Sequence, residues 1–262
     1  MLLNDFKNSP VFFSVLYHPD DNAFLNVKNA LKAGLKVVVY LNKVDEIFLK
    51  KLYDLDVLII GDNTNAGLGK AFYEVEQYLF QNGFEYYVYF DQDTIVSDSF
   101  WNNLVLECRG VYDVDTGLVF YTSEGADKFN SGIVISSGCL FSISVMKEVG
   151  FHDPTYFVEG VDYDYCVKVR RKSLKVKVLE VTGIDHQSLQ DGEDIDFFGQ
   201  TYRARLYGWR RVKDFNFSQL KLLFRSFRYG MYFFSFFFLK SIVSFNLNEI
   251  LSLLLLLFLR KK

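Results

Sequence analysis

The sequence has little of the residues that divide a chain into parts or cross-link it. Of 262 residues only three are Pro, three Cys, three Met and three His. No repeat, low-complexity linker or Pro-rich boundary precedes about residue 200, so one α/β domain of roughly 200 residues with an appendage is expected. Cys108, Cys139 and Cys166 are odd in number and form no C-x-x-C pair. They predict reduced, buried thiols in a cytosolic protein.

Two further absences concern membranes and targeting. Met1–Pro10 is polar and lacks an apolar run, so no secretory signal is expected and the catalytic part should stay inside the cell. Basic residues interrupt Phe217–Phe245, and Ile250–Leu259 is short. Neither run reaches the ~20 apolar residues that cross a bilayer. We therefore expect helices that lie in the membrane interface, with basic residues toward anionic headgroups.

The chain is rich in aromatic residues, and its charge is unevenly distributed. It contains 28 Phe and 17 Tyr, and half of all residues are hydrophobic. From Arg203 to Lys262 there are twelve Lys or Arg and two acids, so this tail carries +10 while the whole chain carries −3. A tail both basic and apolar predicts an anionic membrane surface as partner, and not a nucleic acid. A helical hairpin packed on the catalytic domain or on a homodimer partner is the alternative.

Short apolar runs alternate with amphipathic stretches in the first half of the chain, which predicts a mostly parallel sheet with helices on both faces. The strands expected there are Val11–Leu16, Val37–Leu41, Val57–Ile60 and Tyr86–Phe90, and the helices are Asn22–Ala33, Glu46–Tyr53 and Leu68–Gln81. In the second half we expect strands at Gly117–Tyr121, Ile133–Ser136 and Lys175–Val181, and helices at Ser142–Val149 and Val161–Lys172.

A pair of carboxylates, Asp91 and Asp93, directly follows the Tyr86–Phe90 strand. Residues two apart on an extended segment project to the same side, so both can converge on one hard cation. The C-terminal end of a parallel strand is where α/β sheets bind ligands. A solvated turn with two exposed acids is the alternative reading of an isolated D-x-D.

A second acidic cluster, Glu159, Asp162 and Asp164, opens the predicted helix at Val161. Helix capping and the helix dipole account for one or two of these acids. A third within six residues points to chemistry, and a carboxylate here can act as a general base toward a hydroxyl. His186 follows the last predicted strand and is an ordinary polar loop residue unless the fold brings it to a metal.

Gly67-Leu68-Gly69-Lys70 has the look of a phosphate-binding P-loop, but a Walker A loop requires Ser or Thr after Gly-Lys. Ala71 stands there instead. The segment is better interpreted as the N-terminus of a helix at a tight turn.

Taken in order, five stretches resemble the family 2 glycosyltransferases, and among them the bacterial rhamnosyltransferase-like branch. The match covers roughly residues 11–207 and includes the characteristic L-D-Q-D-[ST], present here as Phe90-Asp91-Gln92-Asp93-Thr94. The other stretches are Val15-Leu16-Tyr17-His18-Pro19, Asn65-Ala66-Gly67-Leu68-Gly69-Lys70-Ala71, Ser137-Gly138-Cys139-Leu140 with Val149-Gly150-Phe151-His152-Asp153, and Phe157 to Arg170.

The resemblance implies the α/β GT-A fold, a Rossmann-like open mixed sheet flanked by helices. It implies a catalytic domain over residues 1–207, and the tail of residues 208–262 would be a basic, aromatic-rich helical appendage that associates with a membrane. The protein would be cytoplasmic and peripheral on the inner face of the cell membrane.

The resemblance also implies an inverting transfer from a nucleotide sugar, with Mn²⁺ or Mg²⁺ as cofactor. Asp91, Asp93 and His186 would bind the metal, Asp162 would be the catalytic base, and Glu159 and Asp164 would shape the acceptor side. The nucleotide sugar would be bound by Tyr17, Asn42, Asn65, Gly67, Lys70, Asp91, Gln92, Tyr202, Arg203 and Arg205.

Two departures from the branch concern the donor. The branch has V-D-N-[GS] after its second strand, whereas this chain has Tyr40-Leu41-Asn42-Lys43 and lacks that carboxylate. His18 replaces the usual Asn. The base, dTDP or UDP, is therefore left open, and rhamnose is preferred over other hexoses only by resemblance.

The expected acceptor is a surface polysaccharide or a lipid-linked oligosaccharide. Two rival functions are a nucleotidyltransferase and a catalytically silent, membrane-associated partner in polysaccharide assembly. The first would need a basic Gly-rich loop near the N-terminus, and Val11–Ala33 contains none.

Overall fold

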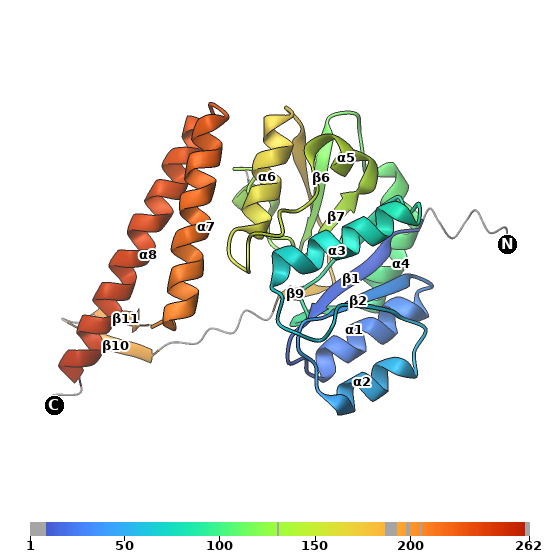
Figure 1. Cartoon of the computed structure of the whole chain (residues 1–262), viewed down its shortest axis with the longest axis horizontal. Helices are drawn as coiled ribbons and strands as arrows, with labels where there is room; N and C mark the ends of the chain where they lie inside the picture. The colour runs from blue at the N-terminus through green and yellow to red at the C-terminus, as the bar shows by residue number, and fades with distance from the viewer. Residues whose placement is uncertain (1–8, 130, 187–192, 198–199, 205, 260–262) are drawn as a thin grey trace. The chain divides into compact units, whose positions relative to one another are not determined.

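A computed structural model describes residues 9–129, 131–186, 193–197, 200–204 and 206–259, which form two compact units, Met1–Gln187 and Ser188–Lys262 (Figure 1). We call them the first and the second unit. Residues 188–207, predicted to belong to the catalytic domain, group with the C-terminal helices. The catalytic domain of residues 1–207 stays a prediction.

A seven-stranded mixed sheet forms the centre of the first unit, in the order β3-β2-β1-β4-β7-β6-β8. Only β7 runs antiparallel to its neighbours. The strands are β1 (Val11–Leu16), β2 (Lys36–Leu41), β3 (Leu58–Ile60), β4 (Tyr86–Tyr89), β6 (Thr116–Thr122), β7 (Cys139–Ser142) and β8 (Lys175–Glu180). Six strands therefore place their C-terminal ends along one edge, where ligands bind in such folds.

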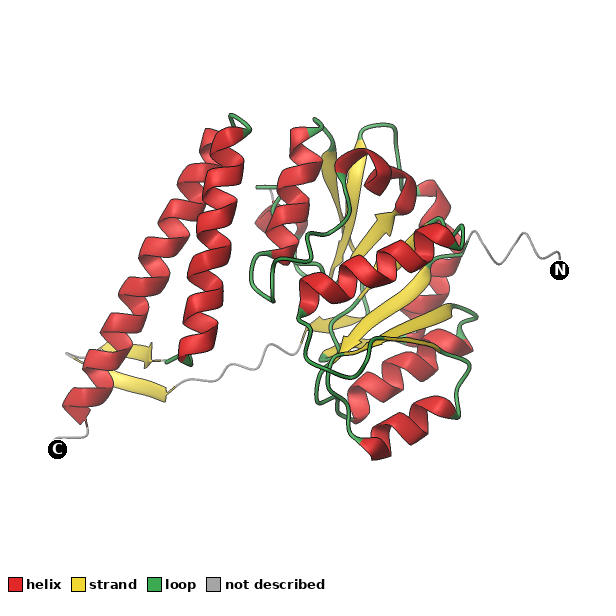
Figure 2. Ribbon diagram, viewed as in Figure 1, coloured by secondary structure: helices red, strands yellow, loops and turns green. Residues whose placement is uncertain are grey.

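Helices cover both faces of this sheet (Figure 2). The helices are α1 (Asp21–Lys32), α2 (Glu46–Tyr53), α3 (Leu68–Gln81), α4 (Asp98–Glu107), α5 (Ile143–Val149) and α6 (Val161–Arg171), with short 3₁₀ turns at Cys108–Gly110 and Ala126–Phe129. Local signals begin several of them: the side chains of Asp20 and Ser97 accept hydrogen bonds from the first-turn amides of α1 and α4.

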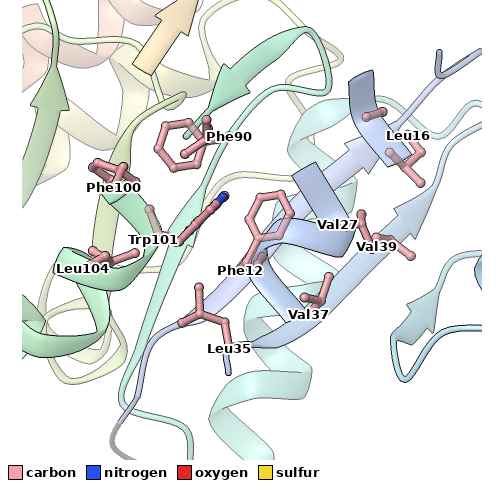
Figure 3. Close-up of a cluster of buried hydrophobic side chains, with 14 of the residues drawn as sticks. Phe12, Leu16, Val27, Leu35, Val37, Val39, Phe90, Phe100, Trp101 and Leu104 are labelled. Atoms are coloured by element: carbon pink, nitrogen blue, oxygen red, sulfur yellow. The ribbon is translucent and has the colours of Figure 1, made fainter. Parts of the chain in front are cut away.

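Neighbouring residues of the central strands pack on opposite faces, and both are buried. Phe12 of β1 contacts Trp101 of α4, with ring centroids 4.9 Å apart, and lies in the apolar cluster that also holds side chains of α1 (Figure 3). Phe13 faces the other side and meets Phe72 of α3 at 5.2 Å. Burying a Phe side chain stabilises the folded state by about 1.5–3 kcal/mol, so burial of Phe12 and Phe13 on opposite faces favours a central place for β1 in the sheet.

A small two-stranded sheet lies outside the main one. β5 (Thr94–Val96) pairs antiparallel with β9 (Ile184–His186), and Thr94 lies opposite His186. Neither strand was predicted, and α4 was not either. Three-residue strands are too short for a periodic signal in the sequence.

Most predicted elements of the first unit are confirmed within one or two residues, but the strand expected at Ile133–Ser136 is wrong. That stretch is irregular, and the strand of this region is β7, which begins at Cys139. Ser136 and Ser137 form a turn instead, with the amide of Gly138 donating to the carbonyl of Tyr89 at 2.8 Å. The edge strand β3 was expected to be buried on both faces, and its residues are only half-buried.

The second unit contains the antiparallel pair β10 (Glu193–Phe197) and β11 (Gln200–Ala204) and the helices α7 (Trp209–Arg228) and α8 (Tyr232–Leu259). The two helices form a hairpin in which Ser226 and Ser235 are buried and hydrogen-bonded at 2.9 Å.

The expectation that neither apolar run of the tail has the length to cross a bilayer is wrong, because α8 is continuous over 28 residues. Two polar residues of α8, Asn246 and Glu249, are hydrogen-bonded within the second unit. The amide of Asn246 donates to the carbonyl of Ile242 and to Asn216 of α7, and Glu249 accepts from the Tyr207 amide. By length and composition, Tyr232–Leu256 could cross a membrane, and only 11% of its most apolar window is buried.

Candidate active site at the C-terminal edge of the sheet

Asp91 lies directly beyond β4, at the edge where the parallel strands end. The Tyr89 hydroxyl donates to its Oδ1 at 2.7 Å, and its backbone amide donates to the Ser137 hydroxyl at 2.9 Å. Burial, together with the negative charges of Asp162 and Asp93, raises the pKa of the Asp91 carboxyl to about 7, although the hydrogen bond from Tyr89 opposes the rise. Three carboxylates therefore share one electrostatic environment that favours a proton or a cation.

His186 is brought to this carboxylate cluster by the β5–β9 pair. Its Nδ1 lies 2.9 Å from the hydroxyl of Thr94, and that hydroxyl lies 3.0 Å from the hydroxyl of Ser137. The fold thus brings His186 to the D-x-D segment, 92 positions away from Thr94 in the sequence, and its role as a metal ligand stays a prediction. Burial lowers the pKa of His186, which favours the neutral imidazole, and its buried Nε2 has no hydrogen-bond partner among the described residues.

Asp162 lies in the first turn of α6, and the Ser136 hydroxyl donates to its Oδ1. Burial raises the pKa of Asp162, while the Ser136 hydrogen bond and the nearby His152 oppose that rise. Ser136 and Ser137 are adjacent, so one turn holds Asp162 through its carboxylate and Asp91 through its backbone. This turn couples the two halves of the site.

The donor set fits a hard divalent cation that a bound diphosphate would complete. Among the described residues, no three His, Cys, Asp or Glu side chains are gathered closely enough to hold a metal by themselves. However, the charges of Asp162 and Asp93 raise the pKa of Asp91, and the charge of Asp93 also acts on His186. The buried Nε2 of His186 has no hydrogen-bond partner in the part of the chain described. Mg²⁺ typically binds to one or two carboxylates together with substrate phosphates, which is the pattern that these residues allow.

Two residues predicted to contact the nucleotide hold backbone in place. Gln92 both accepts from the amide of Tyr17 and donates to its carbonyl, each at 2.8 Å, so it ties the end of β1 to the D-x-D segment. Asn42 is buried, and its side-chain oxygen accepts from the amides of Ala66 and Gly67 at 2.7 and 3.3 Å. Tyr17 itself is 43% exposed at the edge.

The segment that precedes α3 packs against the segment that precedes α6. The Leu68 amide donates to the carbonyl of Phe157, and a Cβ added at Gly67 would lie 2.6 Å from that carbonyl oxygen. Gly67 also has a φ of +87°, which favours glycine. The first free amide of α3 is thus occupied by protein. Lys70 is exposed and lies 3.5 Å from Glu74, and Asn65 is also exposed.

The remaining predicted residues differ in where they lie. Glu159 is half-buried just before α6. Asp164 is buried and lies 2.8 Å from the ammonium of Lys168, so its carboxylate serves the interior of the unit and is closed to an acceptor. Tyr202 and Arg203 belong to β11 of the second unit, and Arg205 lies outside the described residues.

Sequence reasoning missed the hydroxyl groups that assemble the site. Ser136, Ser137 and Thr94 link the acids to His186, and only Ser137 and Thr94 stood in motifs, without assigned roles. It also missed the buried pair of Glu76 and His152, which are 0% and 1% exposed. Serines in an irregular segment carry no periodic signal, so the pattern of the sequence gave neither Ser136 nor Ser137 a role.

No protein-family model matches this chain. Its sequence is 27% identical over 194 residues to the dTDP-rhamnosyl transferase RfbF of Shigella flexneri. The aligned region covers 63% of this chain and 64% of that protein. The chain thus spans just under two thirds of the length of this relative. The resemblance to the rhamnosyltransferase-like glycosyltransferases, predicted from the motifs, is confirmed.

Solved structures confirm the predicted GT-A fold. The structure of residues 1–349 of S. aureus TarS superposes with a TM-score of 0.56 at 11% identity, covering 82% of this chain and 65% of that one. The same protein in complex with UDP-GlcNAc gives a TM-score of 0.56 at 12% identity, covering 82% and 66%. At such identities the likeness concerns the fold alone.

Proposed function

We propose that this chain, a relative of the family 2 glycosyltransferases, transfers a sugar from a nucleotide-sugar donor to a hydroxyl group of a glycan or glycolipid. One observation carries the proposal. Hydrogen bonds through Ser137 and Thr94 join the D-x-D segment to His186, and Ser136, the neighbour of Ser137 in the same turn, holds Asp162 at the ligand-binding edge of the sheet.

The proposed donor is a dTDP- or UDP-sugar, with dTDP-rhamnose as the first candidate. The similarity to a dTDP-rhamnosyl transferase supports this choice, and a TarS structure in complex with UDP-GlcNAc makes UDP-GlcNAc the second donor to test. The exposed ring of Tyr17 lies where β1 ends. It is available to stack on the base or ribose.

The proposed cofactor is Mn²⁺ or Mg²⁺, held by Asp91, Asp93 and His186. A divalent cation bound there would offset the charge that develops on the departing nucleotide diphosphate. The protein's part is to keep the ligands in place. Tyr89 and Ser137 hold Asp91, and Thr94 holds Nδ1 of His186, whose Nε2 makes no hydrogen bond to the described residues.

The proposed reaction is an inverting displacement with Asp162 as general base. Asp162 takes the proton of the acceptor hydroxyl while the acceptor oxygen bonds to the anomeric carbon. The bond from that carbon to the diphosphate oxygen breaks, and the diphosphate carries away the electron pair. Burial raises the pKa of Asp162 and brings it closer to the pH at which a carboxylate is an effective base.

The proposed location is the inner face of the cell membrane, reached through the second unit. Aromatic side chains of α8 such as Phe233 and Phe236 are 70% and 67% exposed, and the tail from Arg203 carries +10. Lys240 and Glu249 stand within α8, and a charge at mid-bilayer costs about 2.5–3.5 kcal/mol even on insertion scales. At the interface these groups reach water, which favours peripheral binding.

The metal and donor assignments are tested by nucleotide-sugar turnover. Purified protein should release dTDP or UDP from its donor in Mn²⁺ and stop in EDTA. Asp91→Ala and Asp93→Ala should each weaken donor binding by roughly tenfold or more, because each removes a charged ligand. Asp98→Ala, an exposed acid nearby in sequence, serves as the matched control.

Two outcomes would contradict the proposal. Full activity in EDTA would exclude the metal, and absence of turnover with every donor would favour a silent assembly partner. Pyrophosphate release from a nucleoside triphosphate and a sugar phosphate would identify a nucleotidyltransferase instead.

A further inference from the structure

A cavity opens at the same edge of the sheet, and Asp162 is not among its lining residues. It has a volume of about 690 Å³ and is enclosed by α4, the end of β6 and the turn after β8. Small-molecule sites typically measure about 300–1,000 Å³. Within the described part of the chain, none of the residues predicted to bind donor or metal lines it.

A short stretch of chain connects the wall of this cavity to the proposed reaction centre. Gly183 forms part of its wall and is followed by β9, which ends at His186. Three residues of extended chain span about 10 Å. Ser123 also lines the cavity, and its neighbour Glu124 acts electrostatically on His186.

The wall next to the reaction centre is held rigidly. The Ser97 amide, at the start of α4, donates to the carbonyl of Gly183 at 2.8 Å. A Cβ at Gly183 would collide with the Ser97 hydroxyl, and its φ of +90° also favours glycine. The cavity is therefore preformed, which lowers the entropic cost of binding a ligand.

The cavity is lined by hydrogen-bond donors and acceptors together with buried apolar side chains. Glu107 and Glu180 accept, while the amide of Asn103 and the hydroxyls of Ser123 and Thr182 both donate and accept. Phe100 and Leu104 are buried beneath them. Among the residues that the structure describes, no Lys or Arg lines the cavity, so a nucleotide or another phosphate ligand is a poor fit.

A buried polar group in the wall lacks a partner. Tyr121 is 5% exposed and lines the cavity, and its hydroxyl makes no hydrogen bond within the described part of the chain. Such a group is normally satisfied by protein, water or ligand. A ligand rich in hydroxyl groups can supply that partner.

We propose that this cavity binds a saccharide unit of the acceptor glycan, apart from the donor site. The inference rests on the proposed glycosyl transfer, since an acceptor that already carries sugars would reach from the cavity to Asp162. The site would then select acceptors by a sugar that is already attached.

The test is binding of methyl glycosides to the full chain, without nucleotide or metal, by saturation-transfer NMR. The probes are methyl α-L-rhamnoside, methyl α-D-glucoside and methyl β-N-acetylglucosaminide. Thr182→Trp, which fills the cavity, should abolish the signal of any binding glycoside. Asn103→Ala should weaken binding about tenfold by removing a hydrogen-bonding amide. Asn102→Ala, its exposed neighbour on α4 outside the lining, should have no effect.

Donor hydrolysis separates this inference from the proposed function. If hydrolysis is unchanged in all three variants and only glycoside binding responds, the cavity is an acceptor subsite. If no glycoside binds, or binding survives Thr182→Trp, the inference is wrong although the transferase stands. If a glycoside binds in the cavity but no donor is hydrolysed, the saccharide site stands and the transferase assignment fails.

Discussion

At the residue scale, the buried carboxylate of Asp162 affects both the stability of the fold and the proposed reaction. It lies in the first turn of α6 and is the proposed general base. Because burial raises its pKa, the ionised form costs more in the folded than in the unfolded chain. That unfavourable term is present above the folded pKa and disappears below the unfolded one. Asp162→Asn should therefore leave the free energy of unfolding at pH 7 unchanged or higher, while turnover falls by roughly 10²–10⁴-fold.

Urea unfolding and steady-state rates check both halves of this prediction. Glu159→Gln is the matched control, because it removes a neighbouring carboxylate outside the Ser136 hydrogen bond. If Glu159→Gln abolishes turnover and Asp162→Asn does not, the base has been assigned to the wrong residue.

Ser136 sets the pH range over which Asp162 is ionised. Its hydroxyl donates to the carboxylate and opposes the rise in the pKa of Asp162 that burial causes. Ser136→Ala should raise that pKa further and move the acid limb of kcat/KM to higher pH, with the alkaline plateau retained. A pH profile of kcat/KM measures this, and the exposed Ser131→Ala should reproduce the wild-type curve. A shift to lower pH would exclude the proposed hydrogen bond.

At the element scale, α3, β4 and the segment leading to α6 meet in the buried pair of Glu76 and His152. Glu76 of α3 accepts from the Tyr87 hydroxyl of β4 and from both the backbone amide and the ring of His152. Glu76→Ala would leave these buried donors unpartnered and should cost about 3–5 kcal/mol. Glu74→Ala, on the half-buried side of the same helix, loses the Tyr40 hydrogen bond and should cost about 1 kcal/mol.

Chemical denaturation in urea distinguishes these two variants of α3. Equal losses of stability would mean that the Glu76 pair does not hold the three elements together. His152 also opposes the rise in the pKa of Asp162. Loss of the pair should therefore change the pKa of the proposed base as well as the stability of the fold.

For the whole molecule, the second unit is proposed to hold the enzyme on anionic lipid. Replacing Phe233 and Phe236 by Ser removes two exposed rings from α8, so folding should persist while sedimentation with anionic vesicles decreases several-fold. Salt should weaken the wild-type binding, because charge contributes to it. Phe234→Ser, at a buried position of the same helix, should instead destabilise the hairpin.

Resistance to extraction from membranes by alkaline carbonate would contradict the peripheral assignment. It would indicate that α8, which has the length to cross a bilayer, does so. Sedimentation unaffected by the double variant would favour a role of the helices in packing on protein.

Local patterns in the sequence were sufficient for most of the first unit's longer strands and helices and for the acids at the end of β4, but not for α4, β5, β7 or β9. The periodicity of apolar residues, helix-capping residues and the position of acids after a strand each involve only a few neighbouring residues, so they can be recognised in the sequence. Only the tertiary structure decided that Ser136 and Ser137 hold both acids, that Thr94 receives His186, and that Asn42 and Gln92 clamp backbone. Those contacts depend on sheet order, above all on β7 lying between β4 and β6. Strand neighbours distant in sequence are chosen by packing the whole core, and no local pattern records that choice.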